Sequence, residues 1–120
     1  MKVYIAGPMR GHAEFNHPAF HAAAALLREE GHMAFSPAEH DLTIGFDPTG
    51  LSAEECADAG VHGFDLRAAL ATDLDWICRQ ADAVATLPGW QASKGARAEV
   101  ATAVALGLEV FEAPEGGGIA

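Results

Sequence analysis

Short apolar runs alternate with amphipathic segments along the whole chain. The run KVYIA, from Lys2 to Ala6, is rich in β-branched and aromatic residues, and residues 32–37, 82–88 and 108–114 have a similar character. Between these runs, apolar residues recur at helical spacing over residues 16–31, 65–81 and 93–107. The pattern therefore predicts four strands that alternate with three long helices.

The residues at the ends of the predicted helices agree with these limits. Pro18 suits the first turn of the first helix, with Asn16 or His17 as its cap, and Gly31 suits its end. Asp65 is the predicted cap of the second helix.

The alternation of strands and helices predicts the fold class. We expect an α/β protein with a flavodoxin-like or Rossmann-like doubly wound parallel sheet of four to five strands and helices on both faces. Residues 1–113 are expected to form a single domain, and the glycine-rich residues 114–120 a flexible tail. Residues 38–64 form a long excursion that contains the capping-box pattern Ser52-x-x-Glu55. We expect it to hold one short helix and to be a candidate lid.

Three loops are expected to meet at the carboxyl ends of the strands, where sheets of this kind bind ligands. Their sequences are GPMRG (residues 7–11), SPAEHD (residues 36–41) and GWQASKG (residues 89–95). The glycines of the first loop allow a ligand to approach the backbone closely, and Arg10 can contact a phosphate with two hydrogen bonds. Ser93, at the start of the last helix, adds a hydroxyl beside free N–H groups. A plain strand-to-helix turn is the alternative for GPMRG.

Glu99 is an unusual residue in a helix that is otherwise small and apolar. Helical spacing places Ala96, Val100, Ala103, Val104 and Gly107 on one face, and Glu99 lies at the edge of that face, one turn inside the helix. A surface glutamate that interacts with the helix dipole is the simpler interpretation. A partly desolvated carboxylate aimed at a ligand is the functional one.

Asp73 is a second carboxylate in an apolar setting. The apolar stripe of its helix consists of Leu66, Leu70, Leu74 and Ile77, and Asp73 falls within it. An unpaired buried aspartate is costly, so Asp73 needs either a structural partner, such as backbone N–H groups or the Arg10 guanidinium, or a chemical role. Two inward carboxylates at the ligand end of a sheet suit the cleavage of a glycosidic bond.

Composition narrows the choice of partners. The chain has 17 acidic and seven basic residues, for a formal net charge of −10, which argues against binding to nucleic-acid polymers. No apolar run is long enough to span a membrane, and the chain opens on a strand rather than on a secretory signal. We therefore expect a cytoplasmic protein.

A few other residues have weaker signals. Trp90 lies in the third loop and could stack on a base or pack on a partner subunit, whereas Trp76 is expected to face away from Asp73 toward another subunit or helix. Cys78 is expected to pack as a small apolar residue. His17 and His21 are four residues apart but have no third ligand with suitable spacing, so we expect no metal and no cofactor.

Three motifs together resemble those of a known superfamily. They are VYIAGPMRG, then DLDWICRQADAVATLPGW, and then Ser93, Gly95 and Glu99 in the spacing S-x-G-x-x-x-E ahead of A-x-A-L-G. This sequence resembles the nucleoside 2-deoxyribosyltransferase superfamily. Within it, the chain is most similar to the 2'-deoxynucleoside 5'-phosphate N-hydrolases and to DUF4406-type proteins of phages and bacteria. The resemblance covers nearly the whole chain except the tail.

The resemblance implies a homodimer that cleaves the N-glycosidic bond of a nucleotide. Glu99 would be the nucleophile, Asp73 would hold the sugar hydroxyls and assist the leaving base, and Tyr4 would lie near the sugar or base. Arg10 and Gly11 fall on one side of the phosphate, and Ser93 and Gly95 on the other. The substrate-binding residues that we expect are Gly7, Pro8, Met9, Arg10, Gly11, Ser93, Gly95 and Trp90.

One departure from the hydrolases affects the phosphate site. Where they often have serine or threonine after the first loop glycine, this chain has Pro8, which has neither a hydroxyl nor an N–H. The sequence thus predicts an N-glycosidase that hydrolyses a nucleoside 5'-monophosphate, with a small-molecule nucleotide or nucleoside as ligand. The alternatives are deoxyribosyl transfer between bases, a non-catalytic nucleotide-binding sensor, and a structural dimer with a vestigial pocket.

Overall fold

The structure of the protein, a computed structural model, describes residues 1–58 and 63–115. Within these residues, one parallel sheet has the strand order β2-β1-β3-β4. Its strands are β1 (Lys2–Ala6), β2 (Met33–Phe35), β3 (Ala83–Thr86) and β4 (Glu109–Glu112). The helices are α1 (His17–Glu29), α2 (Pro37–Thr43), α3 (Leu66–Arg79) and α4 (Lys94–Ala105), with short 3₁₀ turns at Ala13–Asn16 and Trp90–Ala92.

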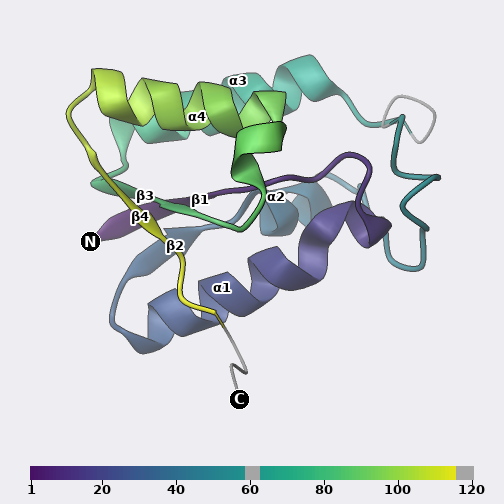
Figure 1. Cartoon of the computed structure of the whole chain (residues 1–120), viewed down its shortest axis with the longest axis horizontal. Coiled ribbons are helices and arrows are strands. Elements are labelled where there is room, and N and C mark those ends of the chain that lie inside the picture. The colour runs from purple at the N-terminus through teal and green to yellow at the C-terminus, as the bar shows by residue number, and fades with distance from the viewer. Residues whose placement is uncertain (59–62, 116–120) are drawn as a thin grey trace.

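The helices cover both faces of the sheet, which confirms the predicted doubly wound α/β fold. Figure 1 shows α3 and α4 over one face and α1 with α2 over the other. The central strand β1 explains the two layers, because successive side chains of a strand point to opposite faces. Val3 and Ile5 pack with Phe20 of α1, whereas Tyr4 and Ala6 pack beneath α3 and α4.

The helix caps follow the sequence signals. The Asp65 side chain accepts a hydrogen bond from the Ala68 N–H at 3.0 Å, which confirms the predicted cap of α3. Ser93 lies just outside α4 and accepts from the Ala96 N–H at 3.2 Å. Each cap satisfies one backbone donor that the first turn of a helix leaves free.

The buried line of α3 differs from the predicted stripe. Ala69, Asp73 and Ile77 are buried, whereas Leu66 is exposed and Leu70 is half-buried. Ala69, Asp73 and Ile77 lie four residues apart and so form one buried line, which leaves the larger leucines at its flank. The prediction was therefore right about Asp73 and Ile77 and wrong about Leu66.

Three other predicted positions are also corrected. Val104 and Gly107 of the last helix are exposed, because the apolar face of α4 is narrower than the spacing suggested and consists of Ala96, Val100 and Ala103. Cys78 is exposed on the last turn of α3, and Cys56 is the buried thiol. Among the described residues, no helix is long and apolar enough to cross a membrane.

The excursion contains its helix at a different place from the one expected. Helix α2 occupies its start, and the capping-box hydrogen bonds of Ser52 and Glu55 form around a turn rather than a helix. Phe46 and Cys56 pack with Phe15 in a small cluster of their own. Residues 59–62 of the excursion and residues 116–120 of the predicted tail lie outside the described residues.

Candidate active site

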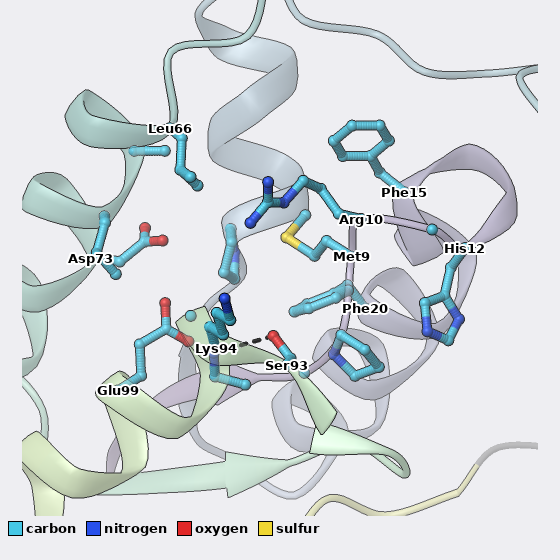
Figure 2. A pocket seen from close by; sticks show the side chains of 18 of the residues that line it. Met9, Arg10, His12, Phe15, Phe20, Leu66, Asp73, Ser93, Lys94 and Glu99 are labelled. Carbon is cyan, nitrogen blue, oxygen red and sulfur yellow. Dashed lines mark hydrogen bonds between the residues drawn. The ribbon is translucent and has the colours of Figure 1, made fainter. Parts of the chain in front are cut away.

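A cavity of about 490 Å³ lies where β1 ends, between α3, the loop after β1 and the first turn of α4. Figure 2 shows Asp73 and Glu99 on one side of it and Met9 and Arg10 on the other. Most of the residues predicted for the site line this one cavity. They are Gly7, Pro8, Met9, Arg10, Gly11, Asp73, Ser93, Gly95 and Glu99.

Two carboxylates and a phenol meet at the inner end of the cavity. Glu99 of α4 and Asp73 of α3 are only 6% and 8% exposed, and Tyr4 of β1 is fully buried. The Tyr4 hydroxyl donates a hydrogen bond of 2.8 Å to Glu99 Oε2. Three segments far apart in sequence thus bring their polar groups to one point beneath an otherwise apolar layer.

Burial governs the proton affinity of this group. It raises the pKa of the Asp73 carboxyl to about 6, against which hydrogen bonding toward Tyr4 and Glu99 lowers it. It also raises the pKa of Glu99 well above its usual range, and the neighbouring Asp73 charge raises it further. Two such carboxyls titrate as a pair, and burial favours a proton on the pair over two charges.

The Tyr4 ring is fixed by two other aromatic side chains. Its centroid lies 5.6 Å from that of Phe35 and 6.3 Å from that of Trp76, and the Phe35 and Trp76 rings are 5.0 Å apart. Trp76 therefore packs beside the carboxylates, and the prediction that it faces away from them is wrong. Helix geometry explains the correction, since residues three apart, such as Asp73 and Trp76, lie on the same side of a helix.

The loop after β1 ends in a turn with an unfavourable backbone conformation. Glu14, Phe15 and Asn16 all have left-handed φ angles, of 53°, 52° and 60°, a conformation that non-glycine residues rarely adopt. The turn is fixed by hydrogen bonds from the Asn16 side chain to the Pro8 carbonyl and from the Glu14 N–H to the Leu51 carbonyl, each of 2.9 Å. The excursion thus supports the wall that carries Arg10.

Two basic side chains lie at the open side of the cavity. Arg10 is exposed, and among the described residues it forms no ion pair, so the alternative of an Arg10–Asp73 pair is not found. Lys94, the first residue of α4, also lines the cavity. Sequence reasoning missed Lys94, although its place between Ser93 and Gly95 was a usable signal.

Gly7 sets the distance between the loops that follow β1 and β3. A Cβ atom at position 7 would lie 2.8 Å from the side chain of Leu87, closer than real Cβ contacts. The loops that leave β1 and β3 therefore touch at this point, and only glycine fits between them.

Trp90 is the one predicted substrate-binding residue that the structure does not bring to this cavity. It lines a separate hollow with Glu112 and Gln91 at the end of β4 and packs partly against the buried layer under α4.

The two histidines of α1 have different environments. His17 is buried, and its Nε2 lies 3.0 Å from Asp41 Oδ2 of α2, whereas His21 is exposed. Among residues 1–58 and 63–115, no three His, Cys, Asp or Glu side chains form a group that could hold a metal ion. Asp41 was not identified from the sequence.

Comparison with known proteins places the chain in a family. The model of a family described as a domain of unknown function, DUF4406, matches residues 1–112. No curated protein and no solved structure matches the chain. The matched range contains all four strands and every residue of the cavity described above. The chain therefore belongs to the DUF4406 family.

Proposed function

We propose that the protein is an N-glycosidase that hydrolyses a nucleoside 5'-monophosphate, with a deoxyribose as the preferred sugar, to the free base and the sugar phosphate. The observation that carries this proposal is the buried Asp73–Glu99 pair at the inner end of a cavity large enough for a nucleotide, where burial raises the pKa of both carboxyls. The resemblance of the sequence motifs to those of 2'-deoxynucleoside 5'-phosphate N-hydrolases supports the same reaction.

In the first step, the Glu99 carboxylate attacks C1' of the sugar and the bond from C1' to the base breaks. The electron pair of that bond leaves with the base, and Asp73 donates the shared proton to it. The reactive form of the pair is the one in which Asp73 holds the proton and Glu99 is ionised. Burial and the Asp73 charge raise the pKa of Glu99 and so favour the proton on Glu99, whereas the hydrogen bond from the Tyr4 hydroxyl opposes them and stabilises the reactive form, because it stabilises the Glu99 charge.

In the second step, water hydrolyses the glycosyl ester. Asp73, now ionised, accepts a proton from the water as its oxygen bonds to C1', and the bond between C1' and Glu99 breaks. The pair then holds one proton again, so the cycle is balanced. A covalent intermediate fits the pair, since retaining glycosidases have closely spaced carboxyls and Asp73 is near enough to Glu99 to act on its pKa.

The open side of the cavity suits the phosphate. Arg10 and Gly11 lie on one wall, and Ser93 and Gly95 lie at the start of α4 on the other. The Ser93 oxygen accepts from the Ala96 N–H, which leaves its proton free for a phosphate oxygen. The positive end of the helix dipole adds to this attraction.

A panel of ribo- and deoxynucleoside 5'-monophosphates, analysed by chromatography for free base, tests the proposal. We expect Glu99→Gln to lower base release by at least about 10³-fold, because the nucleophile is lost. Glu109→Gln, the same change at an exposed site on β4, is the matched control and should keep full activity. Undiminished release by Glu99→Gln would reject the mechanism.

The same assay separates the alternatives. If an added free base is incorporated into a new nucleotide, the reaction is base exchange rather than hydrolysis. If no member of the panel releases base but a nucleotide raises the melting temperature, the protein is a nucleotide binder without this activity.

A further inference from the structure

The basic side chains of this acidic protein have two kinds of surroundings. The chain has seven basic and 17 acidic residues. Arg28 is paired with Glu39, and Arg79 with Asp75. Lys94, by contrast, has no side-chain hydrogen bond or ion pair with any residue in the described part of the chain, although it lines the cavity. Arg10 shares this situation on the opposite wall.

Neither cation serves to neutralise the buried carboxylates. Among the described residues, no ion pair joins Lys94 or Arg10 to Asp73 or Glu99. The cavity therefore has an acidic inner end and a separate basic opening, and its two cations remain available to an anionic part of a ligand.

Lys94 is well placed to contact such an anion. It is the first residue of α4, directly after the Ser93 cap, so its ammonium adds a full charge at the positive end of the helix dipole. In the view of Figure 2, its side chain lies between the carboxylates and Met9, inside the ring of lining residues. Pro8 has no N–H to offer a phosphate from the other wall, and a lysine opposite it replaces that missing donor.

We propose that Lys94 is a specificity-determining residue, which makes the cavity select a ligand that carries a dianionic phosphate over the same ligand without it. This inference rests on the proposed function for the identity of the ligand, and it adds a residue that neither the motifs nor the mechanism uses. Arg10 binds the phosphate from the loop after β1, and Lys94 binds it from α4. Two cations suit a dianion better than a monoanion, because each can neutralise one charge.

Calorimetric binding to the Lys94→Gln protein tests this inference. The probes are 2'-deoxynucleoside 5'-monophosphates, the corresponding 2'-deoxynucleosides and inorganic phosphate. We expect Lys94→Gln to weaken monophosphate binding by about tenfold, the loss typical of one charge-assisted contact, with nucleoside binding unchanged. Lys94→Arg should restore most of the affinity, and added salt should narrow the difference between wild type and Lys94→Gln.

Arg97→Gln is the matched control, since Arg97 is an exposed cation one turn further along α4 and outside the cavity. Equal monophosphate affinity in wild type and Lys94→Gln, or equal losses for nucleotide and nucleoside, would overturn the inference, as would the absence of nucleotide binding. The base-release assay distinguishes this from failure of the proposed function. If wild type releases no base yet Lys94→Gln selectively weakens monophosphate binding, the inference stands and the glycosidase proposal fails.

Discussion

Asp41 of α2 and Asp73 of α3 are buried to a similar extent, but their nearest partners differ. Asp41 is 2% exposed and lies 3.0 Å from a histidine ring that can carry a positive charge. Asp73 is 8% exposed, and its neighbour is another carboxyl, Glu99. Burial alone therefore does not distinguish a structural carboxylate from a reactive one. The partner does, because an opposite charge compensates desolvation and a like charge adds to it.

The contrast also separates stability from reactivity within one small domain. The pair of His17 and Asp41 joins α1 to α2 and so fixes the start of the excursion. The pair of Asp73 and Glu99 joins α3 to α4 at the cost of desolvating two acids, an arrangement typical of catalytic sites. Mutation of one pair should therefore lower the free energy of unfolding, and mutation of the other should raise it.

The largest effect is expected from the compensated pair. His17→Ala leaves Asp41 buried without its partner, and we expect the free energy of unfolding to fall by about 3 kcal/mol. His21→Ala, on the same helix but exposed, should change it by less than about 0.5 kcal/mol. Urea titration measures both. Similar values for the two variants would mean that the His17–Asp41 contact contributes little to stability.

Glu99→Gln should have the opposite sign. Because burial raises the pKa of Glu99, this residue favours the folded state below its unfolded pKa, and that contribution is lost as the pH rises through the folded pKa. Glutamine has no proton to lose, so the variant should be more stable than wild type at neutral pH. The gain should disappear near pH 4, where melting temperatures of the two proteins should converge. A gain that does not depend on pH would contradict this explanation.

The pH dependence of turnover tests how the Asp73–Glu99 pair titrates. The mechanism needs one proton on the Asp73–Glu99 pair, so activity should fall below about pH 6, where Asp73 also becomes protonated and no carboxylate is left to attack. It should fall again above the raised pKa of Glu99, where no proton is left for the base. Initial rates should thus follow a bell-shaped pH profile, in which the rate changes about tenfold per pH unit on the acid side. A rate that does not fall on the acid side would contradict a carboxylate nucleophile, and a rate that does not fall on the alkaline side would exclude the shared proton as the acid.

The smallest effect is expected at Trp90. Since Trp90 lies outside the cavity, Trp90→Phe should change the KM for a nucleotide by less than about twofold, while phenylalanine keeps most of the packing. Steady-state kinetics measures this directly. A large rise in KM with unchanged kcat would indicate that Trp90 contacts the substrate.

The sequence contained enough information to place the strands and both catalytic candidates, but not the face that α3 buries. Leu66 and Leu70 are four residues apart, and so are Ala69 and Asp73, so each pair could form an inward line. The packing of α3 against its neighbours, mainly α4, decides in favour of the line that contains Asp73, and that packing is a property of the assembled layers.

Other features depend on contacts that no local pattern encodes. The Ser52 and Glu55 capping pattern forms its hydrogen bonds without a helix behind them, whereas α2 begins at Pro37. The partnership of His17 with Asp41 joins residues 24 positions apart through the packing of two helices. Residue type and spacing indicated that Glu99 needed an explanation, but only the fold shows that Tyr4 and Asp73 are its neighbours.

The contact between Gly7 and Leu87 has a consequence for how related chains can vary. Because the space at position 7 accommodates a hydrogen atom and not a methyl group, the two positions cannot change independently. A relative with alanine at the equivalent of position 7 should have a smaller residue at the equivalent of Leu87, or a wider separation of the loops that follow β1 and β3. Covariation at these two positions would therefore mark subgroups of the family in which these two loops pack differently.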